Sequence, residues 1–223
     1  MNIKYRPEID GLRAISVIAV VIYHADIVYN GISIFSGGFL GVDIFLVISG
    51  YLITSLILKE LKVKKTFSII NFYERRARRI LPALLGVILF SIPFAWKYLL
   101  PPDFLDYSKS IIYTIFFGSN FYFHFSGLEY GAQSSLLKPF LHTWSLAVEE
   151  QFYIIFPILF VFTYKFYRKH ISKVLWLGFI VSLFLAEWSS RNYSSVAFYF
   201  LHTRMWEILL GSLLAYYSLS IKK

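Results

Sequence analysis

Long apolar runs separated by short charged connections dominate the sequence. The runs cover residues 12–29, 38–58, 80–100, 108–125, 146–164, 174–190 and 196–219. Each is close to the roughly 20 residues that an α-helix needs to cross a hydrocarbon core about 30 Å thick. The pattern therefore predicts an all-α, polytopic transmembrane helical bundle of six or seven helices.

Composition supports this fold class. Of the residues, 57% are hydrophobic and only 16% are charged, which is unusual for a soluble domain. The first run lacks a small-residue cleavage signature, so we expect a retained span rather than a signal peptide. The net charge is +9, but the basic residues lie mainly between apolar runs, which favours a lipid bilayer over nucleic acid as partner. The lack of cysteine excludes disulfides, thiolate metal ligands and acyl-cysteine chemistry.

The basic residues also predict orientation. Lysine and arginine gather at residues 59–79 and 165–173, so both connections are predicted to be cytoplasmic, as is the amino terminus. Alternation of every run would put the second connection outside, so one run must fail to cross. The candidates are 108–125 and 131–145, either of which can be re-entrant where protein covers it. Residues 126–145 then lie outside and Lys222 and Lys223 inside, and Pro82 is expected in a helix's first turn.

The first apolar helix carries two ionisable residues. Arg13 and His24 are eleven residues apart, which brings them within about 20° of each other on one helix face, and Asp10 lies within about 40° of them. A rise of roughly 16 Å keeps them from touching and puts His24 about halfway through the bilayer. Ionisable residues inside a span indicate function, although a snorkelling Arg13 and a packed, hydrogen-bonded His24 are the alternatives.

Later apolar runs contain carboxylates as well. Asp43 is expected either to contact His24 or to cap the outer end of its helix. Glu149 and Glu150 are costly in lipid, unless they stabilise a helix start at the interface.

Arg204 and Glu207 stand three residues apart, the spacing of an intrahelical ion pair for which a structural role would suffice. His124 and His170 are interpreted as ordinary loop residues.

Five separated motifs together resemble the acyltransferase family 3 of membrane O-acyltransferases. They are YRPEIDGLRA at residues 5–14 with its Arg-x10-His spacing to His24, GVDIF and SGY within 41–51, FYERRARRILP at 72–82, HTWSL and EEQFY within 142–153, and RMWE at 204–207. The resemblance implies a domain of roughly ten helices, of which about seven apolar segments are present. Residues 1–223 are therefore expected to be an amino-terminal fragment of that domain.

The resemblance also implies an activity: transfer of an acyl group, with acetyl expected, from cytoplasmic acyl-CoA to a hydroxyl of an extracytoplasmic glycan. The acyl-CoA would be a co-substrate, with no permanently bound cofactor and no metal. The expected location is the cytoplasmic or inner cell membrane, and the expected acceptor is a carbohydrate or glycolipid.

Residue chemistry fits these roles. Imidazole titrates near neutral pH, guanidinium groups pair with phosphates, and carboxylates beside aromatic rings suit a sugar. We expect catalysis by His24, Asp43 and Glu149, donor binding by Arg13 at the inner interface and by Arg75, Arg76, Arg78 and Arg79, and acceptor binding by His142, Trp144, Glu150, Tyr153, Arg204 and Glu207. The arginine run is explained equally by a cytoplasmic loop without a ligand.

Two other classes of protein fit parts of the pattern. In a transporter or flippase, buried charges would bind a polar or glycolipid substrate without reacting with it. In a scaffolding membrane protein, the same residues would only pack.

Overall fold

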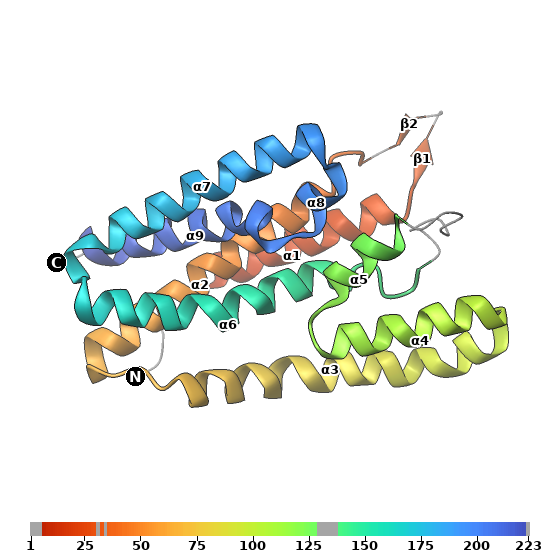
Figure 1. Ribbon diagram of the computed structural model, residues 1–223, viewed down its shortest axis with the longest axis horizontal. Coiled ribbons are helices and arrows are strands. Elements are labelled where there is room, and N and C mark those ends of the chain that lie inside the picture. The colour runs from red at the N-terminus through yellow and green to blue at the C-terminus, as the bar shows by residue number, and fades with distance from the viewer. Residues whose placement is uncertain (1–5, 30–31, 34, 129–137, 222–223) are drawn as a thin grey trace.

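The computed structural model describes residues 6–29, 32–33, 35–128 and 138–221, most of which are helical (Figure 1). The long helices are α1 (Pro7–His24), α2 (Leu40–Lys64), α3 (Ile69–Tyr98), α4 (Pro101–Ile115), α6 (Thr143–Phe166), α7 (Ile171–Asn192) and α9 (Leu201–Ile221). The short elements are α5 (Ser119–Ser126), the 3-10 helix η2 (Arg168–His170), α8 (Ser194–Tyr199) and the antiparallel strands β1 (Val28–Tyr29) and β2 (Ile32–Ser33). The all-α prediction is confirmed.

The long helices lie side by side in a bundle (Figure 1). One end, which we call the basic end, carries the α2–α3 connection and η2. The other, which we call the distal end, carries the β1–β2 hairpin and α8. In the described part of the chain, four segments are long and apolar enough to cross a membrane: α2, α3, α6 and residues 168–192. Lys222 and Lys223 lie outside the described residues.

Close packing of α2 against α9 forms the centre of the bundle. A Cβ atom at Gly50 would meet the backbone oxygen of Ile208, and one at Gly211 would meet that of Val47. Small residues allow such backbone contact, which maximises dispersion between membrane helices. Ile208 is fully buried at this seam.

Residues 108–125 do not form a crossing helix. They divide between α4, which returns along α3, and α5, which turns back toward the distal end (Figure 1). Phe117 adopts φ 53° in the turn, and its carbonyl accepts a 2.9 Å hydrogen bond from Gln151 Nε2. Gln151 Nε2 also donates to the fully buried Asn120 at 2.8 Å. The irregular backbone is thus satisfied inside protein, as expected of a run that does not cross as one helix, and its re-entrance into the membrane stays a prediction. Of the other candidate, residues 131–137 lie outside the described part.

Helix α3 begins earlier than its apolar run. Ser68 caps it by accepting a 3.3 Å hydrogen bond from the backbone N–H of Asn71. Pro82 therefore lies in the helix interior, and its predicted place in the first turn is wrong. The apolar pattern missed this start because the first turns of α3 are rich in arginine, which now belongs to a helix rather than a loop.

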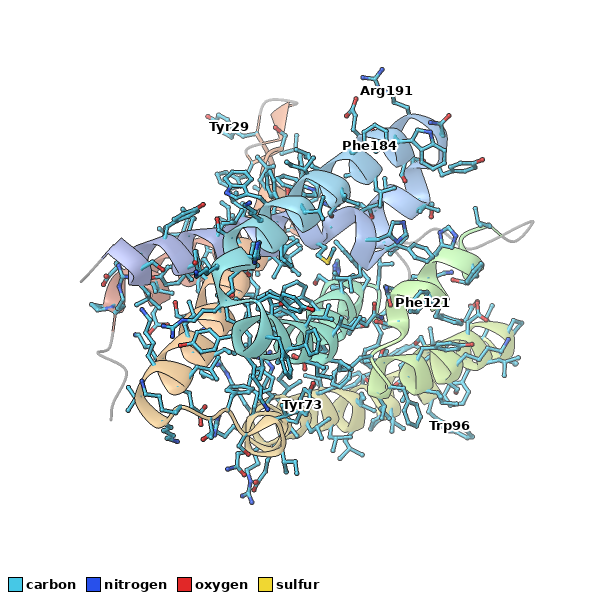
Figure 2. The ribbon with its side chains drawn as sticks, turned by 60° about the vertical axis from the view of Figure 1, so that its left-hand side comes forward. Tyr29, Tyr73, Trp96, Phe121, Phe184 and Arg191 are labelled. Atoms are coloured by element: carbon cyan, nitrogen blue, oxygen red, sulfur yellow. The ribbon has the colours of Figure 1, made fainter. Side chains whose placement is uncertain are left out.

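Apolar side chains also cover the outside of the bundle. Figure 2 shows Trp96 and Phe184 pointing away from it, and they are 77% and 68% exposed. So much apolar surface fits lipid rather than water.

Candidate functional site

Two histidines from distant parts of the chain meet at the distal end. His24 is the last residue of α1, His142 immediately precedes α6, and their ring centroids lie 4.4 Å apart at an interplanar angle of 80°. His24 Nδ1 lies 2.8 Å from the carbonyl oxygen of Val20. A carbonyl oxygen only accepts, so Nδ1 carries the proton and the lone pair of Nε2 is available. Loss of hydration, reinforced by the nearby His24, lowers the pKa of His142 below its usual 6.5.

The predicted depth and partner of His24 are both wrong. The residue ends α1 at the distal end and is exposed, instead of lying halfway along a span. Helix α1 begins at Pro7 and is only 18 residues long, whereas the apolar run suggested a helix that continues to residue 29. His24 packs against His142 and not against Asp43, which binds elsewhere.

A cavity of about 250 Å³ lies between α1, α2 and α6, on the basic-end side of this pair. Its walls come from three helices: Ser16, Val17, Val20 and Val21 of α1, Gly41, Val42, Phe45 and Leu46 of α2, and Ser145, Leu146 and Glu149 of α6. His24 follows Val20 and Val21 by one helical turn, and His142 precedes Ser145 by one turn. Residues three or four apart share a helix face, so both imidazoles continue the cavity walls outward.

Glu149 also lines this cavity. It is seven residues beyond His142, a rise of about 10 Å. Its Oε1 atom accepts hydrogen bonds from Ser49 Oγ at 2.5 Å and from Tyr153 OH at 2.6 Å. The carboxylate is buried in the second turn of α6, so the alternative of an interfacial helix cap is wrong.

Arg76 links this carboxylate to the next one. Its guanidinium donates to Glu150 Oε1 from Nη2 at 2.6 Å and from Nε at 3.1 Å, and it lies 3.9 Å from Glu149. It also lies 3.7 Å from the ring centroid of Tyr153. Arg76 and the two glutamates were predicted on opposite faces of the membrane. They are in contact, so that separation is wrong, and Arg76 is occupied within the protein.

The other arginines of α3 remain at the surface. Arg78 pairs with Glu74 at 2.8 Å and Arg75 lies 3.7 Å from Glu60, while Arg79 is exposed. They stay candidates for binding a phosphate.

Arg13 packs against α2. Its guanidinium carbon is 5.4 Å from the ring centroid of Phe45, the sixth residue of α2 counted from the distal end. Its place at the inner interface stays a prediction. Asp10 lies 3.7 Å from Arg13, which confirms that these two share a helix face.

A second charged cluster centres on Arg204. Its Nη1 atom binds Asp43 at 3.1 Å and Glu207 at 3.0 Å, which confirms the predicted pair with Glu207 and adds a partner from α2. The guanidinium also lies 5.6 Å from the ring centroid of Trp144 and 5.3 Å from that of Phe198. Among the described residues, Asp43 makes no hydrogen bond that caps α2. The alternative prediction, that Asp43 caps the outer end of this helix, is therefore wrong.

Asp43, Arg204 and Glu207 line a cavity of about 390 Å³ beside α7 and α8. Val42 lines the cavity between α1, α2 and α6, whereas Asp43 lines the cavity beside α7 and α8. The first turn of α2 therefore separates the two cavities.

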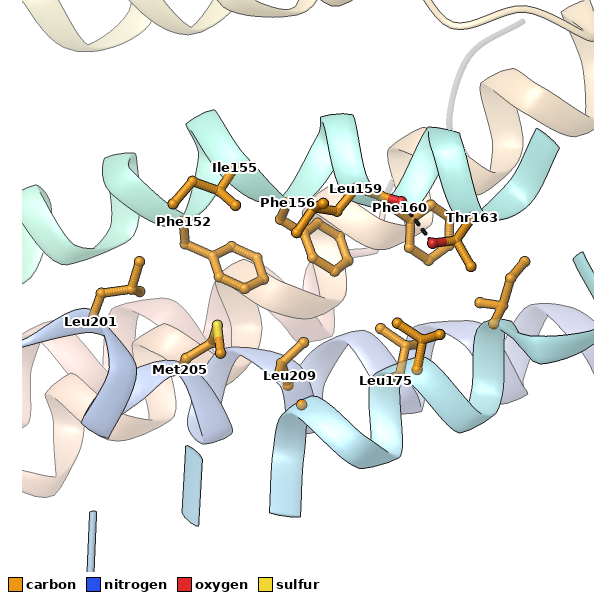
Figure 3. Close-up of a pocket in the computed structure, with 13 residues that line it drawn as sticks. Phe152, Ile155, Phe156, Leu159, Phe160, Thr163, Leu175, Leu201, Met205 and Leu209 are labelled. Atoms are coloured by element: carbon orange, nitrogen blue, oxygen red, sulfur yellow. Dashed lines mark hydrogen bonds between the residues drawn. The ribbon is translucent and has the colours of Figure 1, made fainter. Parts of the chain in front are cut away.

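A third cavity, of about 150 Å³ between α6, α7 and α9, is apolar (Figure 3). Its hydroxyl group, on Thr163, donates to the carbonyl oxygen of Leu159 at 2.8 Å (Figure 3). With its polar atom already bonded, this cavity offers packing space rather than chemistry.

His124 is not an ordinary loop residue, contrary to prediction. It is buried in α5, its Nδ1 atom lies 2.9 Å from Ser195 Oγ, and burial lowers its pKa. The aromatic residues that flank it in the sequence were the available signal. His170 is exposed in η2, as expected of a connection.

Comparison with known proteins places these features in context. A family model described as "Acyltransferase domain" matches residues 6–223. The chain is 36% identical over 221 residues to "O-acetyltransferase OatA" of Staphylococcus aureus (strain NCTC 8325 / PS 47), and 38% identical over 219 residues to "Putative O-acetyltransferase SAS0844" of Staphylococcus aureus (strain MSSA476). Each match covers 96% of this chain but 35% of the relative, so the chain spans about a third of their length. No solved structure matches it.

Proposed function

The chain belongs to the acyltransferase-domain family, and from this membership we propose that it carries out transmembrane O-acyl transfer. The proposed donor is a cytoplasmic acyl-CoA, and the proposed acceptor is a hydroxyl of an extracytoplasmic glycan. Acetyl is the proposed group because the relatives carry the name O-acetyltransferase. The observation that carries the proposal is the His24–His142 pair, one helical turn from a cavity that Glu149 lines.

His24 is the proposed general base. Its Nδ1–H is held by Val20, so Nε2 points its lone pair away from the helix and is free to take the hydroxyl proton. Attack of the resulting oxygen on a thioester carbon forms the ester and releases a thiolate. An apolar cavity excludes water from the thioester, which favours transfer over hydrolysis.

The donor and acceptor are assigned to different groups. The exposed Arg75, Arg78 and Arg79 are proposed to meet the phosphates of the donor. Arg76 is proposed instead to position Glu149 and Glu150, because its nitrogens already bind them.

The cavity beside α7 and α8 is proposed to hold a part of the glycan beyond the reacting hydroxyl, because the first turn of α2 separates this cavity from the one near His24. Arg204 and Glu207 supply hydrogen-bond donors and acceptors there, next to the ring of Phe198. Aromatic faces beside such groups suit a carbohydrate.

Reconstituted vesicles test this proposal against transport. The full-length protein receives radiolabelled acetyl-CoA on one side and a glycan acceptor on the other, and acetylated glycan is expected. His24→Ala should lower the rate by about 10² to 10⁴, the usual contribution of a general base. His170→Ala, at an exposed position in η2, is the matched control and should retain full activity.

A loss below tenfold for His24→Ala, at normal abundance, would contradict the proposal. Movement of unmodified glycan without any acetylation would favour the transporter instead.

A further inference from the structure

The geometry of the histidine pair raises the question of what the second imidazole does. His24 has one nitrogen committed to Val20 and one available. For His142, the described residues supply no hydrogen-bond partner to either ring nitrogen, while its ring lies edge to face with that of His24. Two imidazoles with free nitrogens are therefore in contact, each one helical turn from residues that line the cavity.

Transfer from a thioester to a hydroxyl requires two proton movements. The O–H bond breaks as the C–O bond forms, and the C–S bond breaks as the sulfur leaves as a thiolate. The thiolate then becomes a thiol by gaining a proton. A single imidazole would have to perform both steps in turn, whereas two adjacent imidazoles can divide them.

We propose that His142 is a second catalytic residue, which receives the proton that His24 takes from the acceptor hydroxyl and delivers it to the departing thiolate. The inference rests on the proposed function. The protons in this step balance, because one proton leaves the hydroxyl, passes from His24 to His142 and ends on sulfur. Both imidazoles return to their neutral forms.

Electrostatics favour the last step, the delivery of the proton from His142 to sulfur. Two imidazolium ions with ring centroids 4.4 Å apart repel each other, so a positive charge on His24 disfavours protonation of His142. The lowered pKa of His142 makes its imidazolium a better proton donor than an ordinary one. A thiolate with a conjugate-acid pKa of about 8.5 accepts that proton readily.

The leaving group provides the test. The full-length protein in vesicles is assayed with acetyl-CoA and with p-nitrothiophenyl acetate, an aryl thioester whose thiolate is far less basic and leaves without protonation. His142→Gln should lower transfer from acetyl-CoA by about 10² to 10⁴ and transfer from the aryl thioester by less than about tenfold. His24→Gln should lower both, because the hydroxyl must still be deprotonated. His170→Gln should change neither.

Equal loss with both donors, or a loss below tenfold with acetyl-CoA, would overturn the role of His142. The unfolding temperature is measured for His142→Gln and His142→Asn. The variant that keeps the wild-type unfolding temperature is the one whose transfer rates decide the role of His142. A wild-type protein that transfers from neither donor would instead remove the proposed function itself, so the two failures are distinguishable.

Discussion

The two faces of α2 are built in opposite ways. Toward α9, Gly50 and the facing Gly211 bring backbones into contact, and the seam between them is fully packed. Toward α1 and α6, the same helix borders a cavity of about 250 Å³ that Glu149 lines, one helical turn from the two histidines. The packed face fixes α2 so that the open face keeps its shape, which a site for two reactants requires.

The largest expected effect on stability is at the contact of Arg76 with Glu149 and Glu150. Arg76→Met leaves Glu149 and Glu150 buried beside each other without a cation, so the free energy of unfolding should fall by about 3–5 kcal/mol. Denaturant unfolding in detergent measures this. Arg78→Met removes an exposed pair with Glu74 and is the matched control, with no measurable change expected.

A double variant checks the cause. Arg76→Met combined with Glu150→Gln should recover part of the lost stability, since one uncompensated charge is gone. If Arg76→Met unfolds at the same denaturant concentration as Arg78→Met, the buried network is not what holds α3 to α6.

The packed face should respond next. Gly211→Ala places a methyl group against the backbone oxygen of Val47, and overpacking of this kind costs about 1–3 kcal/mol or more. Gly86→Ala in α3 meets no atom within 4 Å and should instead be neutral, or stabilising by up to about 1 kcal/mol through helix propensity. Thermal unfolding of both variants compares them directly, and equal midpoints would show that the α2–α9 seam is loose.

Filling the cavity should affect activity more than stability. Val20→Phe projects a ring into the space between His24 and Glu149, and transfer should fall by about tenfold or more because reactants are displaced. Ile15→Phe adds the same bulk on the exposed side of α1, where the side chain is 64% accessible, and should leave transfer unchanged. Equal rates for the two variants would mean that neither reactant enters this cavity.

The smallest expected effect is a change in titration. His24→Gln removes one of the two causes that lower the pKa of His142, so that pKa should rise while staying below 6.5, because desolvation persists. Histidine NMR against pH measures it, with His170→Gln as the control.

The lowered pKa of His142 has a consequence for the stability of the protein. His142 binds its proton more weakly when folded, so the free energy of unfolding should decrease as pH falls below about 6.5 toward the folded value. A downward shift of the pKa in His24→Gln would refute the electrostatic coupling of the pair.

Helical periodicity predicted what lies within a single helix. It placed Asp10 and Arg13 on one face and paired Arg204 with Glu207, and the structure confirms both. Charge counting showed that one apolar run must fail to cross, although only the Gln151 contact explains how the turn at Phe117 is tolerated.

Contacts between helices could not be predicted from the sequence. Asp43 was expected near His24 because the two were predicted at similar depths, yet it meets Arg204, 161 residues away. Periodicity gives the face of a helix but not the helix that opposes it, so the His24–His142 and Arg76–Glu150 contacts could not be foreseen. Arginine density suggested a loop at residues 75–79, and the Ser68 cap shows why the helix starts earlier.

The Arg76–Glu150 contact also constrains how the protein is made. The two residues are 74 positions apart, so at roughly 5–20 residues per second the ribosome reaches Glu150 about 4–15 s after Arg76. During that interval the guanidinium has no carboxylate from α6. Completion of α6 supplies the counter-charge, so the Arg76 end of α3 cannot reach its final contacts before α6 has been made.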